Sequence, residues 1–331
     1  PPFPPPPPPS RPLVPPPSPP TFLAPSSPQA QLKVCTPFDP AGFNFSKIRN
    51  PAERLVLLQL QTGHYEVLTN KFPLFSRHML LVAKDLVPQQ LNLAHLLAIT
   101  ELIGGCSFSA YFNSWGASAS VNHFHCHLVD ELPPVAQLPL ALGPFVSGVR
   151  CMTPDGFSGF CYVFPSSRQG AHQVNSCVRA MQDDNQPHNL LFTPKYIYVW
   201  PKPVVRPERS FTLYPETVGG PELIGSFTVY TEEDFGILTP ESVAEAARIN
   251  TAPLPSRMLQ FSDTLDDACN ELTSRAGIQP YAQRLPRASK SLDTRSLDTW
   301  MAGASSTVAG ATRLNKPPGS AGRHIPCVTW T

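Results

Sequence analysis

The sequence predicts an α+β fold in which an antiparallel sheet carries packed helices. Two strand-like runs, residues 54–60 and 65–69, flank a turn signal at residues 61–64. A third strand-like run covers residues 78–83, and residues 91–102 then place apolar side chains at helical spacing. Together with the strands that follow, this order indicates an antiparallel meander with one helix packed on it.

Further strands complete this block and begin a second one. Residues 107–113 and 122–129 are strand-like, whereas residues 130–148 are rich in Pro and Leu and predict a loop. A second block then repeats the strand, helix and strand theme without clear sequence identity. Its expected elements are a strand at 160–164, a helix at 171–184, a hairpin at 189–200 that turns near 193–195, and more strand in 211–230 around a turn at Gly219 and Gly220.

A last helix is expected from Pro240 to about residue 249, because Thr239 is a good N-cap and proline suits the first helical position. We therefore expect a catalytic domain at 34–255, made of two related halves at about 34–148 and 149–255. Residues 256–331 are expected to be a mostly low-complexity, disordered tail.

The N-terminal segment has a composition that cannot form a core. Of the 42 prolines among 331 residues, 16 fall within residues 1–30, where Arg11 is the one charged residue. Such a segment favours the polyproline II conformation and stays solvated. We expect residues 1–33 to be a disordered tail, with a polyproline-binding protein as an alternative partner.

Charge and cysteine usage exclude several classes of protein. Basic and acidic side chains nearly balance, 25 against 24, which argues against a general electrostatic grip on nucleic acid or an acidic membrane. No apolar run is long enough for a membrane span. The 8 cysteines show no CxxC spacing and favour reduced thiols in a cytoplasmic protein. The chain starts at Pro1 without Met, so a preceding targeting signal is left open.

The residues with the clearest chemistry are three alternating histidines, His123, His125 and His127. On a strand these side chains share one face, while Phe124 and Cys126 point the other way and can enter the core. Three interpretations compete: a metal site, a purely structural set, and nucleophilic catalysis. Three histidines on a straight strand spread over about 13 Å, too far to close on one ion without a bend.

We favour nucleophilic catalysis on a nucleotide. A neutral imidazole nitrogen can attack a phosphorus atom and form a phosphoramidate, while flanking histidines hydrogen-bond the phosphate oxygens. The small-residue loop at residues 113–120 supports this interpretation, because backbone N–H groups and serine hydroxyls can hold phosphate oxygens. An ordinary turn is the alternative for this loop.

These motifs resemble the histidine-triad superfamily and, within it, the GDP-hexose phosphorylases: the plant GDP-L-galactose and animal GDP-D-glucose enzymes. The resemblance covers about residues 36–250. Four stretches carry it, at residues 38–48, 77–89, 112–125 and 185–201. Two positions differ from parts of the family: His127 stands where plant enzymes tend to have Gln, and Arg77 stands where a Gly is usual.

The resemblance implies a histidine-triad-like sheet and a nucleotidyltransferase that converts a GDP-hexose and inorganic phosphate to hexose 1-phosphate and GDP. It makes His125 the nucleophile, with His123 and His127 stabilising charge on the phosphate oxygens. The expected substrate-binding residues are Asn113, Ser118, Ser120, Asn70 and Lys71. No metal or other cofactor is required by this chemistry. For the plant enzymes it also implies ascorbate biosynthesis.

Alternative functions stay open at this point. A dinucleoside polyphosphate phosphorylase or a hydrolase of the same superfamily would use the same histidine with another substrate or acceptor. A non-catalytic nucleotide-binding module would keep the fold alone, and a scaffold would act through the proline-rich tail. We expect neither nucleic acid nor a membrane as partner, and a monomer or a homodimer.

Overall fold

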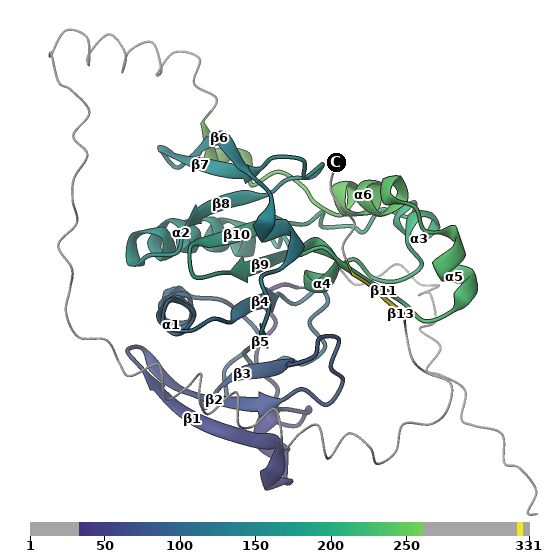
Figure 1. Cartoon of the computed structure of the whole chain (residues 1–331). Coiled ribbons are helices and arrows are strands. Elements are labelled where there is room, and N and C mark those ends of the chain that lie inside the picture. Colours follow the sequence, from purple (N-terminus) through teal and green to yellow (C-terminus); the bar gives the residue numbers. More distant parts are fainter. Residues whose placement is uncertain (1–32, 261–322, 327–331) are drawn as a thin grey trace, which may run out of the picture. The chain divides into compact units, whose positions relative to one another are not determined.

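The computed structural model describes residues 33–260 and 323–326. Within them, one antiparallel sheet of eleven strands forms the centre (Figure 1). In order across the sheet, its strands are β1 (Arg54–Leu60), β2 (Gly63–Thr69), β3 (Met79–Ala83), β5 (His125–Val129), β4 (Ser109–Asn113), β9 (His188–Phe192), β10 (Tyr196–Pro201), β8 (Tyr162–Pro165), β7 (Val149–Pro154), β6 (Leu140–Val146) and β12 (Leu259–Gln260).

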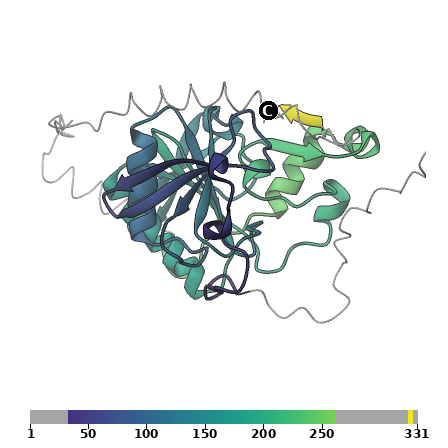
Figure 2. The ribbon, with the colours of Figure 1, turned by 90° about the horizontal axis from the view of Figure 1, so that it is seen from below.

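Two helices, α1 (Leu93–Gly104) and α2 (Arg168–Asp183), pack on one face of this sheet and contact each other (Figures 1 and 2). Each begins at a side-chain cap: the Asn92 side chain accepts from the His95 N–H, and the Ser167 hydroxyl accepts from the Gly170 N–H. Between sheet and helices lies the larger apolar core, which includes Cys126.

The strand order repeats itself in mirror fashion from the centre outward. From the β4–β9 pair, one side continues as β5, β3, β2 and β1, and the other as β10, β8, β7 and β6. Each helix also stands at the same point of its half, α1 between β3 and β4 and α2 between β8 and β9. The fold is therefore α+β with two related halves, as the sequence predicts. We propose that the halves divide between β5 and β6 rather than at residue 148, because β6 is the counterpart of β1.

One row of paired residues makes the repeat specific. It starts at the central pair Tyr111–Leu191. On one side it continues through His127, Leu80 and Leu68, and on the other through Tyr198, Val163 and Met152. Residues directly opposite on neighbouring strands share a face. His127 in the first half thus has Tyr198 as its counterpart in the second.

The second half carries an additional layer on the face opposite α1 and α2. It consists of α3 (Ser210–Leu213), α4 (Gly220–Leu223), β11 (Ser226–Val229), α5 (Glu232–Ile237) and α6 (Pro240–Ile249) (Figures 1 and 2). A second apolar cluster joins this layer to the sheet and includes Leu191, Tyr198 and Trp200. A short strand, β13 (Arg323–Pro326), pairs with β11.

Most strands and both long helices agree with the sequence predictions to within a few residues. The hairpin β9–β10 turns at residues 193–195, and α6 begins at Pro240 after a Thr239 cap. The 3₁₀ turns are η1 (Phe45–Lys47), η2 (Pro51–Glu53), η3 (Pro134–Gln137) and η4 (Ser256–Met258). No helix in the described part of the chain combines the length and apolar character that a membrane crossing requires.

Two predicted segments are wrong. Residues 140–146 form strand β6 instead of a loop; Pro144 falls at an irregularity in its pairing with β7, where a strand tolerates proline. In residues 211–230 only β11 is a strand. Gly219 is the cap of α4 rather than part of a turn, since the Glu222 carboxylate accepts from its N–H.

Within the predicted C-terminal tail, residues 256–260 form η4 and β12 and residues 323–326 form β13. The predicted polyproline segment up to residue 32, and residues 261–322 and 327–331, lie outside the described residues.

Candidate active site

His125 begins β5, and its partners fix which ring nitrogen carries the proton. Its side chain is buried, and Nδ1 lies 2.8 Å from the carbonyl oxygen of His123. Because a carbonyl oxygen only accepts, Nδ1 carries the hydrogen and Nε2 keeps its lone pair. Nε2 has no hydrogen-bond partner within the described residues. The ring is therefore arranged as a nucleophile.

Burial sets the charge of this ring. Desolvation lowers the pKa of His125 to about 4, and the neighbouring His123 acts in the same direction. The hydrogen bond to the His123 carbonyl opposes the shift without reversing it. The imidazole is thus neutral at physiological pH, as an attacking nitrogen must be.

His127 lies two residues along the same strand, with its ring 5.5 Å from that of His125. Its Nδ1 is 2.8 Å from Nε2 of His78, and Nδ1 of His78 accepts from the Leu74 N–H. A neutral His78 must then carry its proton on Nε2 and donate it to His127. As a result His127 bears its own proton on Nε2, where it can be donated to a ligand.

Two further groups hold this pair of histidines. Tyr111 stacks flat on His127, with ring centroids 4.4 Å apart, and its hydroxyl lies 3.2 Å from Nε2 of His78. The Asn70 amide nitrogen is 3.1 Å from the same atom but cannot accept its proton. Burial lowers the pKa of His78 to about 4 and that of His127 well below its ordinary value. Both rings are therefore neutral hydrogen-bonding groups.

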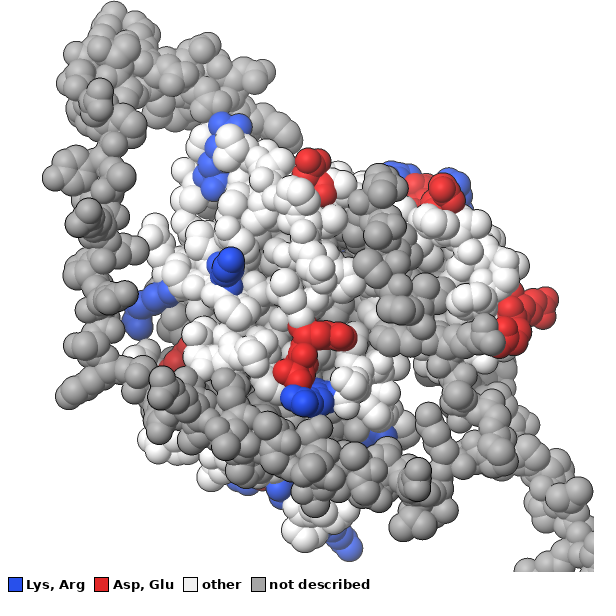
Figure 3. Space-filling view, in the orientation of Figure 1, with Lys and Arg blue, Asp and Glu red and all other residues white. Residues whose placement is uncertain are grey.

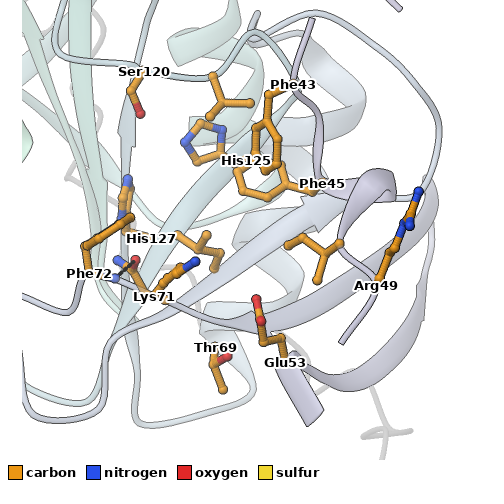
Figure 4. A pocket seen from close by; sticks show the side chains of 14 residues that line it. Phe43, Phe45, Arg49, Glu53, Thr69, Lys71, Phe72, Ser120, His125 and His127 are labelled. Atoms are coloured by element: carbon orange, nitrogen blue, oxygen red, sulfur yellow. Dashed lines mark hydrogen bonds between the residues drawn. The ribbon is translucent and has the colours of Figure 1, made fainter. Parts of the chain in front are cut away.

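A pocket of about 380 Å³ opens beside His125 and His127 (Figure 4). The remaining lining residues come from the segment 43–53, from β2 and its following turn, from β3 and from the loop before β5: Phe43, Phe45, Ile48, Arg49, Glu53, Thr69, Asn70, Lys71, Phe72, Leu80, Ser120 and Val121. In Figure 4, His127, Lys71 and Phe72 lie at one side of the pocket and Arg49 at the other. The cavity therefore combines neutral imidazoles, cationic side chains and an apolar wall.

His123 lies outside strand β5 and outside the pocket lining. The strand begins at His125 rather than at residue 122, so the alternation that predicts one common face does not reach His123. Its Nδ1 accepts from the Phe45 N–H and its Nε2 is 3.1 Å from the Asp85 carbonyl oxygen. His123 thus holds the segment 43–53 and, through its own carbonyl, orients His125.

Gln89 fixes the main chain of His125 from the other side. Its side-chain oxygen accepts from the His125 N–H at 2.8 Å, and its amide nitrogen donates to the carbonyl oxygens of His125 and Asn113, each at 2.9 Å. Asn122 in turn accepts from the Gln89 N–H and donates to the Pro37 carbonyl. Two of the family-like stretches, 77–89 and 112–125, therefore meet directly behind His125.

The structure separates the predicted substrate-binding residues into two groups. Asn70, Lys71 and Ser120 line the pocket with His125 and His127. Asn113 does not: its buried side-chain oxygen accepts from the Asn189 amide and the Gly220 N–H. Ser118 has a positive φ of 76° and packs against Gly219. The small-residue loop thus serves partly as a seat for α4, which sequence alone does not reveal.

The comparisons with known proteins bear on this site. A family model described as GDPGP1-like, N-terminal domain, matches residues 24–129, which include β1 to β5 and the histidines described above. This part of the chain is similar to that family.

The curated relatives that this chain resembles carry one name. GDP-D-glucose phosphorylase 1 of Danio rerio is 40% identical over 183 residues, which cover 50% of this chain and 51% of the fish protein. The Homo sapiens protein of the same name is 38% identical over 128 residues, covering 34% of this chain and 33% of the human protein. The chain thus spans about half the length of the first relative and less of the other. These matches confirm the resemblance to GDP-hexose phosphorylases.

Among solved structures, this chain is similar to the yeast Ap4A phosphorylase Apa2, with a TM-score of 0.47 and 18% identity over 63% of this chain and 83% of that one. A likeness of this degree carries no argument about the reaction. In the described residues, no group of three or more His, Cys, Asp or Glu side chains is placed to hold a metal ion.

Sequence analysis missed two residues that position the site, His78 and Gln89. Both lie inside the family-like stretch 77–89, which was the available signal, but neither has a catalytic pattern of its own. Surface charge does not indicate a further binding site on the face seen in Figure 3. On that face, basic and acidic side chains of the described residues occur without a broad patch of either sign.

Proposed function

We propose that the chain is a GDP-hexose phosphorylase that works through a guanylyl-histidine. Nε2 of His125 attacks the α-phosphorus of a GDP-hexose, a nitrogen–phosphorus bond forms, and the bond to the β-phosphate oxygen breaks. Hexose 1-phosphate leaves and takes up a proton. Inorganic phosphate then attacks the same phosphorus, releases GDP and restores the imidazole.

The observation that carries this proposal is the hydrogen bond from Nδ1 of His125 to the His123 carbonyl. It directs the lone pair of Nε2 outward and remains in place when the phosphorylated ring becomes cationic, because the carbonyl then faces a full positive charge. The names of the relatives support a guanine nucleotide and favour GDP-D-glucose over GDP-L-galactose.

The other pocket residues have separable roles in this proposal. His127 Nε2–H donates to the departing phosphate, supported by the His78 donor behind it. Lys71 supplies positive charge for the β-phosphate, while Ser120 and Asn70 hydrogen-bond phosphate oxygens or ribose hydroxyls. His123 acts as a positioning residue instead of a phosphate ligand.

A substrate panel with trapping tests the proposal. With phosphate present, GDP-glucose should be converted to GDP and glucose 1-phosphate, and mass spectrometry should find a GMP adduct on the peptide that contains His125. We expect His125→Asn to lower kcat/KM by about 10⁴-fold or more and to abolish the adduct. His172→Asn, at an exposed position on α2, is the matched control and should leave both unchanged.

Other outcomes point to other functions. Survival of both GDP-glucose and GDP-galactose would contradict the proposal. Consumption that does not require phosphate would indicate a hydrolase, and cleavage of dinucleoside polyphosphates alone would indicate a dinucleoside polyphosphate phosphorylase. Binding of nucleotides without turnover would indicate a non-catalytic module.

We also propose that one chain suffices for the site and that it works in the cytoplasm. All pocket residues come from one half of one chain, and the six cysteines among the described residues form no disulfide. Light scattering on the active protein should give a monomer; activity confined to a dimer fraction would contradict this.

A further inference from the structure

Glu53 is an acidic residue of the pocket lining that the reaction above does not use. It closes the 3₁₀ turn η2, directly before β1, and lines the same cavity as His125 and Lys71 (Figure 4). A carboxylate repels phosphate oxygens, so its presence in a nucleotide pocket calls for a ligand group that donates hydrogen bonds.

The position of Glu53 is fixed by its neighbours. The Asn50 side chain caps η2 by accepting from the Ala52 N–H, and its amide nitrogen lies 3.3 Å from Oε1 of Glu53. The Glu53 N–H donates to the Asn50 carbonyl. Oε2 has no hydrogen-bond partner among the residues that the structure describes, so one carboxylate oxygen remains available.

Sheet register places Glu53 far from the reacting phosphorus. His127 pairs with Leu80, Leu80 with Leu68, and Leu68 with Arg54, the residue after Glu53. Three strand spacings amount to about 14 Å. The carboxylate therefore lies at the end of the pocket that is remote from the α-phosphate site.

An apolar wall of Phe43, Phe45 and Ile48 extends from His125 towards that end, with the Phe45 ring 5.0 Å from the His125 ring, and Thr69 lines the pocket as well (Figure 4). The Arg54 guanidinium holds this wall by donating to the carbonyl oxygens of Phe45 and Ile48. An aromatic and aliphatic wall fits a flat nucleobase better than a hexose, whose hydroxyl groups would need polar partners.

We propose that Glu53 selects guanine by accepting hydrogen bonds from the N1–H and 2-amino groups of the base. Arg49, on the same wall, is a donor suited to the O6 acceptor of guanine. Adenine has an unprotonated N1 and no 2-amino group, so it would leave the carboxylate unpaired and facing a lone pair. This inference rests on the proposed function only for its turnover measurements.

The test compares GMP, IMP and AMP binding by calorimetry, because IMP lacks only the 2-amino group. The wild-type protein should bind GMP roughly 10- to 100-fold more tightly than IMP and AMP. Glu53→Ala should bring the GMP-to-IMP ratio close to one, while Glu53→Gln should retain part of it. Glu131→Gln, at an exposed acidic residue outside the pocket lining, is the control and should keep the full ratio.

Turnover with GDP-, IDP- and ADP-glucose should show the same loss of discrimination in kcat/KM. If no nucleotide sugar is turned over but the binding ratios behave as expected, the proposed function fails and the assignment of Glu53 stands. An unchanged GMP-to-IMP ratio in Glu53→Ala would overturn the assignment. A changed preference among GDP-hexoses with an unchanged base ratio would equally overturn it, since Glu53 would then contact the sugar.

Discussion

The two halves of the sheet have the same strand order but opposite surroundings on the face away from α1 and α2. In the first half this face carries His125 and His127 and opens into a pocket. In the second half the counterpart of His127 is Tyr198, which stacks against Trp200 beneath the layer formed by α3 to α6. The same backbone therefore supports a reactive site on one side and an apolar core on the other.

This difference shows that the repeated topology fixes where side chains point but not what they do. Tyr111 and Leu191 face each other across the centre and both belong to the second apolar cluster, yet Tyr111 also stacks on His127. The chemistry depends on which residue stands at each position of the row and on whether the face above it is covered.

The largest effect that we expect is a loss of stability in mild acid, concentrated in the first half. Burial lowers the pKa of five histidines there, His78, His95, His123, His125 and His127, and of His188 in the second half. Below pH 6.5 these histidines bind protons in the unfolded chain, whereas in the folded protein their buried rings stay neutral. Stability should then fall by about 1 kcal/mol per pH unit for each of His78, His95, His125 and His188, whose pKa is lowered to about 4 in the folded protein, and His123 and His127 add to the loss in the same direction.

Denaturant midpoints between pH 7 and pH 5 measure this loss. Hydrogen exchange over the same range, corrected for intrinsic rates, should show a greater loss of protection in β3 and β5 than in β8 and β10. Equal losses in the two halves, or stability that does not change, would contradict the assignment of neutral histidines.

A substitution at matched positions of the two halves sharpens the comparison further. His127→Phe should lower kcat by about 10²- to 10³-fold, as expected for the loss of one donor to a developing charge. Tyr198→Phe, at its counterpart, should leave kcat unchanged. A similar loss in both variants would mean that the effect arises from the fold and not from the donor.

A smaller effect is expected where the covering layer meets the first half. A Cβ at Gly220 would lie 2.5 Å from the Asn113 side-chain oxygen and 2.6 Å from Cδ2 of Tyr111. Gly220→Ala should therefore destabilise the protein by roughly 1–3 kcal/mol in urea unfolding. Gly104→Ala, at the end of α1 with nothing within 4 Å of the added carbon, should stabilise it by about 0.5–1 kcal/mol. Unchanged stability in Gly220→Ala would show that α4 is not seated tightly on β4.

Sequence patterns were informative where local signals and tertiary packing agree. Thr239 and Pro240 set the start of α6 by themselves, and the alternation in β9 and β10 marks a hairpin. The pattern around β6 misled, because Gly143 and Pro144 resemble a loop although the pairing irregularity accommodates them. In residues 211–230, the capping contact of Glu222 with Gly219 outweighed the strand-like composition.

The sequence predicts the pair His125 and His127, but it does not predict the residues that hold this pair in place. The alternation of His125 and His127 follows from β5 alone, but the proton order of His127 depends on His78, which is 49 residues away. Likewise Asn113 is a polar residue beside a small-residue loop, and only the packing of α4 shows that its side chain is used inside the protein. Long-range contacts of this kind have no signature in a single sequence.

The side-chain amide of Gln89 hydrogen-bonds both the N–H and the carbonyl oxygen of His125. Under the proposed function, the ring gains and loses a nucleotide while the main chain of His125 stays in place, so each half-reaction is confined to the imidazole and the nucleotide that it carries. Another segment, residues 43–53, supplies much of the pocket wall away from the histidines. Substitutions in this segment can therefore change substrate preference during evolution without moving His125 or the groups that hold it.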